Sequence, residues 1–479
     1  MKREFSINIA LLLIINLLIK PIYIFGIETQ VQNVVGIENY GLYFAYFNFV
    51  FLFQFINDPG LQTWNAQYVP KNQNLINDYF PNLLTTKLLL AFIFFPLVMI
   101  IGSIIGFGDM KLVMVLSLNL VLSSLFMIMR TTMSGLGHYR TDSWISALDK
   151  VLMIIIIGGL MAYQGNRNSF TIMTFVYGQC VSYIISCFIA SFLLLSKIQI
   201  NFLGIKIESI KYILRSSLPY VLTLLFMSAY NKLDGIMLGN LLDDGNYQAG
   251  VYASAYRFYD AANMTGYLFA ALLLPMFGAN IFDKKMLEEL TGIGLRYILV
   301  SSIVVVSVIF FYGENILQFL YKDYESTFDI VLKILIVSYV AVAVAYVYGT
   351  LLVAAGKIRN LNVVFGLGLL VNVVLNLVLI PKYQAIGAAI ATMITQTFVM
   401  LGQIFLVDKE MYIRMSASDL KKPLIFILIS TSVFYLVKQI FLGSWIYNLA
   451  ASLLFCLLLS FIFKIIEKQD FFSLKNRNE

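Results

Sequence analysis

Four charged residues, Lys232, Asp234, Arg257 and Asp260, carry the most informative chemistry in this 479-residue chain, because they lie inside the long apolar region 212–275. A charge at the centre of a membrane helix costs roughly 2.5–3.5 kcal/mol on insertion scales. The four together would cost on the order of 10–14 kcal/mol if they faced lipid. We therefore expect them to face water or one another, as charged residues do along a path through a membrane.

The cations and carboxylates of this region suit different tasks. Arg257 is the strongest candidate for holding a phosphate, because a guanidinium can pair with phosphate oxygens through two bonds. Lys232 and, in the first apolar stretch, Lys20 are candidate partners of the same kind. A structural alternative remains open, in which Lys232–Asp260 or Arg257–Asp234 is an ion pair that locks two helices. A gating role for Asp234 and Asp260 is consistent with both interpretations.

Aromatic and amide side chains recur near Arg257 at helical spacing. Tyr252, Tyr256, Tyr259, Asn263 and Tyr267 follow one another at intervals of three or four residues, which places them on one helix face. Tyrosine rings can stack on sugars while their hydroxyls form hydrogen bonds. Ordinary packing between helices is the alternative for each single tyrosine.

The sequence carries no pattern for catalysis, metal binding or ATP hydrolysis. It has no G-x-x-x-x-G-K-[ST] phosphate loop, and its only histidine, His138, falls in a predicted turn. Cys180, Cys187 and Cys456 lie in apolar stretches without the spacing of a metal site or a disulfide framework. We expect no catalytic residue, no metal and no cofactor. The chain is predicted not to be an enzyme.

Composition places most of the chain in a membrane. It is 60% hydrophobic and 12% charged, whereas soluble proteins carry about 25% charged residues. Apolar runs of roughly 20 residues, each long enough to span the hydrocarbon core, recur from end to end. The net charge of +7 does not indicate a nucleic-acid partner, because the basic residues are scattered through short loops.

The apolar runs predict an all-α polytopic membrane protein with about 14 transmembrane helices. They are continuous and lack the alternation of a membrane barrel. The first is interpreted as a retained helix, since no small-x-small cleavage site follows it. The expected spans are 7–27, 40–57, 84–106, 111–130, 145–163, 171–195, 213–240, 247–275, 293–312, 328–354, 361–380, 384–406, 422–442 and 445–466.

Lysines and arginines concentrate in alternate loops, as Arg140, Lys197 and Lys357 illustrate. Because positive residues mark the cytoplasmic side, this pattern predicts that both termini are cytoplasmic. Asp149 and Lys150 lie near a predicted span end, and we expect their side chains to extend to the membrane surface.

Two sequence matches indicate an internal repeat. Residues 41–49 (GLYFAYFNF) align with 250–258 (GVYASAYRF), and 137–140 (GHYR) align with 356–359 (GKIR). Each match joins predicted helices six apart in order, which gives a parallel repeat. The predicted parts are two six-helix lobes followed by a final helix pair with a cytoplasmic tail, namely 1–200, 205–410 and 411–479.

Three segments carry a family resemblance: residues 376–392 (NLVLIPKYQAIGAAIAT), 233–239 (LDGIMLG) and the 354–357 turn (AAGK). Together with the span count and the repeat, they resemble the O-antigen and lipid-linked oligosaccharide flippases. These flippases belong to the multidrug/oligosaccharidyl-lipid/polysaccharide exporter superfamily. The resemblance covers nearly the whole chain.

The resemblance implies a V-shaped transporter with a central cavity between the lobes and alternating access. The implied cargo is an undecaprenyl-pyrophosphate-linked oligosaccharide, moved from the cytoplasmic to the outer leaflet of the bacterial inner membrane for surface polysaccharide. Membrane lipid and other polysaccharide-assembly proteins are the implied partners. Phosphate-binding cations and sugar-binding aromatic groups, such as those named above, would then line a wet groove.

Two other functions stay in view. A multidrug exporter of the same superfamily would favour a negatively charged cavity, whereas Lys20, Lys232 and Arg257 outnumber Asp234 and Asp260. A membrane polysaccharide polymerase would need a large outer loop with catalytic groups. The longest outer loop expected here, near 313–327, has only about 15 residues.

Overall fold

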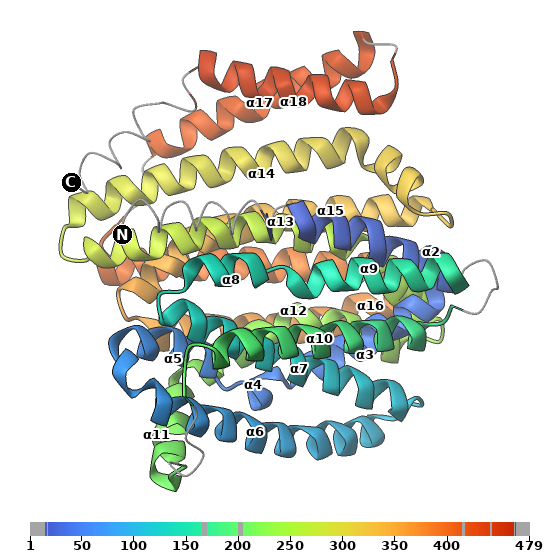
Figure 1. Cartoon of the computed structure of the whole chain (residues 1–479). Coiled ribbons are helices and arrows are strands. Elements are labelled where there is room, and N and C mark those ends of the chain that lie inside the picture. The colour runs from blue at the N-terminus through green and yellow to red at the C-terminus, as the bar shows by residue number, and fades with distance from the viewer. Residues whose placement is uncertain are drawn as a thin grey trace. The chain divides into compact units, whose positions relative to one another are not determined.

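The computed structural model describes residues 15–16, 18–164, 170–199, 205–413, 417–440, 443–463 and 465, and within these ranges the regular structure is helical, without a strand. The chain divides into two compact units, Met1–Gly250 and Val251–Glu479, called here the N-terminal and C-terminal units. Figure 1 shows the helices of both. The predicted all-α polytopic membrane fold is confirmed. The predicted lobe boundaries near residues 200 and 410 stay a prediction.

Helices of very different length build the N-terminal unit. They are η1 (Ile22–Glu28, a π-helix), α2 (Thr29–Val35), α3 (Ile37–Leu52), α4 (Gln54–Asn57), α5 (Leu61–Tyr68), η2 (Val69–Lys71), η3 (Gln73–Leu75), α6 (Ile76–Ile105), α7 (Met110–Gly135), α8 (Tyr139–Ile145), α9 (Leu148–Gln164), α10 (Ile172–Leu195), α11 (Ile207–Ser217), η6 (Leu218–Tyr220), α12 (Val221–Leu241) and the first turns of α13 (Gly245–Ala279).

Longer helices build the C-terminal unit. They are the rest of α13, α14 (Lys284–Leu320), α15 (Ser326–Ala354), α16 (Ile358–Met411), α17 (Ala417–Ile440) and α18 (Trp445–Ile462). The outer loop expected near 313–327 is much shorter than predicted, because α14 continues to Leu320 and α15 begins at Ser326. Residues 313–320 of this stretch form the last two turns of α14.

Eleven helices of the described residues are long and apolar enough to cross a membrane. α16 contains two of the predicted spans, because the backbone leaves the helical region at Gln384 (φ 52°, ψ −132°), shortly after Pro381. The predicted span 40–57 corresponds to the separate helices α3 and α4. The predicted span 7–27 begins in residues outside the described ranges. These three differences explain why 11 candidate spans are found where 14 are predicted.

The outward faces of the long helices are apolar. On α6, Phe92 and Ile104 each expose 78% of their surface, and Leu88 and Ile100 are also exposed. A soluble protein rarely presents such a continuous apolar surface to water. These side chains therefore face the hydrocarbon of the membrane.

A short break follows the second predicted span. α4 ends at Asn57, and the residues Asp58, Pro59 and Gly60 separate it from α5. Pro59 lacks the backbone N–H that would continue the helix. Gly60 adopts a positive φ of 91°, which an L side chain rarely tolerates. The break leaves carbonyl groups of α4 without helical partners.

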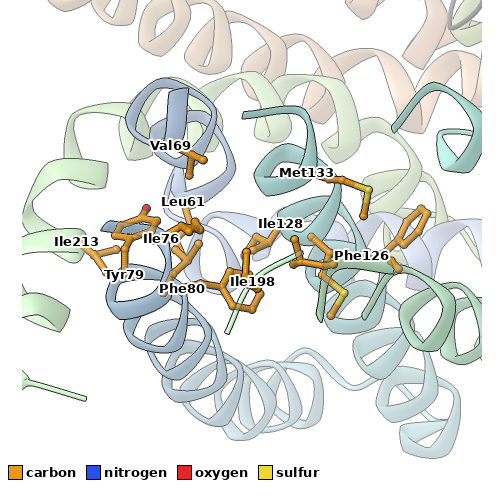
Figure 2. Close-up of a cluster of buried hydrophobic side chains, with 14 of the residues drawn as sticks. Leu61, Val69, Ile76, Tyr79, Phe80, Phe126, Ile128, Met133, Ile198 and Ile213 are labelled. Atoms are coloured by element: carbon orange, nitrogen blue, oxygen red, sulfur yellow. The ribbon is translucent and has the colours of Figure 1, made fainter. Parts of the chain in front are cut away.

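A buried apolar cluster joins α5, α6, α7, α10 and α11 next to this break. Figure 2 shows its members converging from several helices, with Ile213 of α11 beside Tyr79 of α6. A second cluster, which includes Tyr312, Phe434 and Cys456, packs α17 and α18 against α14. The first cluster thus packs around α6, and the second packs the last two helices against α14.

Candidate functional site

In the N-terminal unit, glycines bring α12 close to α3. A Cβ atom at Gly235 would lie 2.2 Å from Asn48 Nδ2, and one at Gly239 would lie 2.9 Å from Ala45 Cβ. The two helices can approach this closely only because these positions lack side chains. The contact fixes the orientation of the charged residues on α12.

Lys232 and Asp234 lie on this tightly packed helix. Lys232 Nζ is 5.3 Å from the ring centroid of Phe51 and 6.0 Å from that of Phe47, distances at which an ammonium is attracted to an aromatic face. Lys232 is half-buried, whereas only 1% of Asp234 is exposed. Both charges are thus held by the protein and do not project into lipid.

In the C-terminal unit, Arg257 is held by a tyrosine that the sequence analysis did not single out. Only 5% of Arg257 is exposed. Its Nη1 donates a 2.6 Å hydrogen bond to Tyr321 Oη, which in turn donates to the carbonyl of Ser254 at 3.2 Å. Tyr321 follows the last residue of α14, and nothing in the sequence spacing relates it to α13.

The tyrosines of α13 form a stack. The ring centroids of Tyr252 and Tyr256 are 5.7 Å apart, and those of Tyr256 and Tyr259 are 5.4 Å apart. The prediction that these three share a helix face is confirmed. All three are buried, and Tyr252 Oη forms a hydrogen bond of 3.1 Å with Thr392 Oγ1 of α16. Their predicted contact with a substrate stays a prediction.

The remaining predicted residues differ in exposure. Asp260 is exposed, Asn263 is half-buried, and Tyr267 exposes 66% of its surface. Lys20 is half-buried and precedes the π-helix η1 by one residue, Pro21. The ion pairs Lys232–Asp260 and Arg257–Asp234 both stay predictions.

Neighbouring side chains hold Lys150 in the N-terminal unit, and its reach to the membrane surface stays a prediction. Its Nζ lies 4.7 Å from the ring centroid of Tyr23 and 5.8 Å from that of Tyr183, and 3.4 Å from Asp149 Oδ2. Gln179 Nε2 donates to Tyr23 Oη at 3.2 Å, which fixes the ring under the ammonium. Aromatic faces and a carboxylate therefore hold this charge inside the N-terminal unit.

Lys87 was missed by the sequence analysis, although it is fully buried in α6. Its Nζ donates 2.5 Å hydrogen bonds to both the backbone carbonyl and Oδ1 of Asn57, the last residue of α4. The neighbouring Asp58 is buried and accepts hydrogen bonds from Gln62 N and Ser124 Oγ, each at 3.3 Å. Lysine within an apolar run and an Asp-Pro-Gly break were the available signals, but only the tertiary structure joins them.

Within the described ranges, no three histidine, cysteine or acidic side chains lie close enough to hold a metal ion. The arrangement instead offers buried or half-buried cations whose orientation is fixed by aromatic rings, hydroxyls and carbonyls. Such groups can bind an anionic headgroup and the hydroxyls attached to it.

Comparison with known proteins identifies the chain's relatives. A family described as polysaccharide biosynthesis protein matches residues 7–281, which is more than half of the chain. An uncharacterised membrane protein of Methanocaldococcus jannaschii is 24% identical over 349 residues, which cover 69% of this chain and 80% of that protein.

Solved transporters share the fold. The lipid II flippase MurJ, in an inward closed conformation, matches with a TM-score of 0.73 and 18% identity, covering 96% of this chain and 98% of MurJ. An inward-facing multidrug resistance transporter of the MATE family and MOP superfamily matches with a TM-score of 0.65 and 15% identity, covering 79% of this chain and 92% of the transporter. The chain therefore shares the fold of these transporters.

Proposed function

Because this chain belongs to the polysaccharide biosynthesis protein family, we propose that it is a flippase for a lipid-linked oligosaccharide. The proposed cargo is an undecaprenyl-pyrophosphate glycan for O-antigen or capsule. It moves from the cytoplasmic to the outer leaflet of the bacterial inner membrane, and both protein termini are cytoplasmic. Similarity of fold to a lipid II flippase supports a lipid-linked substrate.

The burial of Arg257 is the observation that carries this proposal. A buried guanidinium in a helix long and apolar enough to cross a membrane is costly unless it has a function or a compensating partner. Tyr321 engages Nη1, and a guanidinium has five N–H donors, so it can hold more than one partner in a fixed direction. The pyrophosphate is the part of the cargo that matches this chemistry best.

In the proposed mechanism, the lipid tail stays in the bilayer while the headgroup enters a cationic cavity open to the cytoplasm. Arg257, Lys232 and Lys20 attract the pyrophosphate, and the tyrosines of α13 contact sugar rings when the cavity opens. Asp234 and Asp260 pair with the cations when the headgroup has left. Rocking of the lobes exposes the headgroup on the other side.

Substitution of Arg257 tests the proposal in cells that depend on this chain for surface glycan. Arg257→Ala should reduce the export rate roughly 10- to 100-fold, because hydrogen bonds to charged groups contribute about 1.5–3 kcal/mol. The lipid-linked unit should accumulate on the cytoplasmic side. Arg257→Lys, which keeps the charge but loses the forked geometry, should have an intermediate effect.

Tyr321→Phe provides a graded test with a matched control. Loss of its hydroxyl should reduce export roughly 2- to 10-fold, since one neutral hydrogen bond contributes about 0.5–1.5 kcal/mol. Tyr312, on α14, is likewise buried, and its hydroxyl forms a 3.4 Å hydrogen bond with Ser452, so Tyr312→Phe controls for the loss of a buried tyrosine hydroxyl. Normal surface glycan in correctly inserted Arg257→Ala would remove Arg257 from the mechanism.

A multidrug exporter is the second candidate, and the shared fold with a multidrug resistance transporter supports it. Such an exporter would lower the accumulation of cationic dyes in cells, and neutralising Asp234 or Asp260 would abolish this effect. A polysaccharide polymerase is less consistent with the structure, because only residues 321–325 join α14 to α15 where a catalytic loop would be needed.

A further inference from the structure

A small cavity in the N-terminal unit lies apart from the residues assigned above. It has a volume of about 290 Å³ and is formed by residues of α5, η2, α7 and α8. This size is just below the roughly 300–1,000 Å³ typical of small-molecule sites. The cavity can therefore hold one small group but not an oligosaccharide. Its lining consists of Ala66, Pro70, Met127, Arg130, Thr131, Ser134, Gly135, Tyr139 and Asp142.

An ion pair fixes one wall of the cavity. Arg130 Nε donates to Asp142 Oδ1 at 2.9 Å, and both side chains are largely buried. Arg130 Nη1 also lies 3.5 Å from the carbonyl of Ser146. Because the guanidinium and the carboxylate neutralise each other, the wall offers donors and acceptors without a net charge.

Hydroxyl groups complete the polar lining. Thr131 Oγ1 accepts a hydrogen bond from Asn65 Nδ2 at 2.8 Å, which ties the opposite helix α5 to α7. Ser134 Oγ has no hydrogen-bond partner in the part of the chain that the structure describes. Its hydroxyl is therefore available to a ligand.

The apolar part of the lining is closely packed on one side. Gly135 lies so close to η2 that a Cβ atom there would be 2.8 Å from Val69 Cβ and 3.3 Å from Pro70 Cδ. Gln73 Nε2 donates to the carbonyl of Gly135 at 3.0 Å, and this hydrogen bond stabilises the close contact of Gly135 with this part of the chain. Ala66, Pro70 and Met127 thus present a preformed surface to the C–H face of a ligand.

From this arrangement we infer that the cavity binds one uncharged, hydroxyl-rich group of hexose size. Each ligand hydroxyl can donate to Asp142 or accept from Arg130 and Ser134, and an aliphatic ring face can pack on the apolar wall. The Asp142 carboxylate repels a bare anion, and the Arg130 guanidinium repels a cation. The inference builds on the proposed function: the group is a sugar of the lipid-linked headgroup or a free sugar.

Binding can be measured on the purified full chain in lipid nanodiscs by saturation-transfer NMR. The probes are glucose, N-acetylglucosamine and inorganic phosphate, each at roughly millimolar concentration, where weak sites are occupied. We expect signals from at least one of the two sugars and no competition by phosphate. Competition by phosphate, or no sugar signal, would overturn the inference.

Ser134→Leu tests the location, because the added side chain fills the cavity from a helix that accepts leucine well. The sugar signal should fall at least tenfold. Ser123→Leu is the matched control, since Ser123 is also half-buried on α7 but does not line the cavity. An equal signal in Ser134→Leu and the control would place the sugar elsewhere and contradict the inference.

Glycan export by Ser134→Leu distinguishes the two sources of sugar. Slower export together with lost binding assigns the cavity to the headgroup, and normal export with lost binding assigns it to a free sugar. Both outcomes support the cavity as a sugar site. The proposed flippase function is tested separately through Arg257, so failure of one leaves the other standing.

Discussion

At the scale of single residues, Lys87 shows how this chain keeps a charge inside a membrane helix. The break after Asn57 leaves a backbone carbonyl at the negative end of a short helix, and the ammonium of Lys87 binds that carbonyl at 2.5 Å. Asn57 is itself held, because its Nδ2 donates to Gln54 Oε1 at 3.1 Å. The broken helix and the buried lysine therefore stabilise each other.

Removal of the Lys87 charge should destabilise the N-terminal unit. Lys87→Met keeps most of the volume but leaves the carbonyl of Asn57 without its donor and Asp58 without its neighbouring cation. Loss of hydrogen bonds made by a charged group costs about 1.5–3 kcal/mol. A fall in the thermal unfolding midpoint of the detergent-solubilised protein would report this loss.

Lys71→Met is the control for Lys87→Met, because Lys71 is exposed in η2. It should leave the midpoint unchanged. The double variant Lys87→Met/Asp58→Asn should recover part of the stability, since it no longer buries an uncompensated carboxylate. A Lys87→Met protein as stable as the wild type would contradict the structural role of this lysine.

At the scale of helices, glycines determine which segments can touch. Gly41 of α3 and Gly250 of α13 begin the two repeat segments, and they meet in the N-terminal unit. A Cβ atom at Gly41 would lie 2.5 Å from Gly250 N and 1.8 Å from the carbonyl oxygen of Asn246. Backbone contacts backbone here, so no side-chain movement can make room.

Gly41→Ala should therefore destabilise the protein by about 3 kcal/mol, the upper end of the usual cost of overpacking. Gly159→Ala is a suitable control, because a Cβ atom at this helical position meets nothing within 4 Å. It should be neutral or stabilise the helix by up to about 1 kcal/mol. The yield of monodisperse protein and the thermal unfolding midpoint would be measured for both variants. Equal stability of Gly41→Ala and Gly159→Ala would contradict the close contact at Gly41.

The helices could be predicted from sequence, but several of their interruptions could not. Runs of apolar residues predict most spans, because a membrane imposes helix on any such run. The sequence predicts that a span ends near Asp58, whereas the structure has a short break followed by α5. It also predicts a longer loop near residues 313–327 than the one between α14 and α15. The partners Tyr321 and Lys87 were missed, since each lies far in sequence from the group it binds and no periodicity links them.

At the scale of the whole molecule, the chain is an all-α polytopic membrane protein with the fold of known transporters. Its polar chemistry occurs in both compact units: Lys87, Lys150 and Lys232 in the N-terminal unit and Arg257 in the C-terminal unit. A transporter that holds its headgroup through fixed cations needs such groups within helices that otherwise face lipid.

Translocation of lipid-linked oligosaccharide in proteoliposomes tests the central claim most directly. The lipid is purified from the cells that encode the chain, and the accessible headgroup is measured on each side of the vesicle. We predict transfer well above that of protein-free vesicles, and a roughly 10- to 100-fold lower rate for Arg257→Ala. Transfer by the wild type no faster than in protein-free vesicles, or an Arg257→Ala rate equal to that of the wild type, would contradict the account.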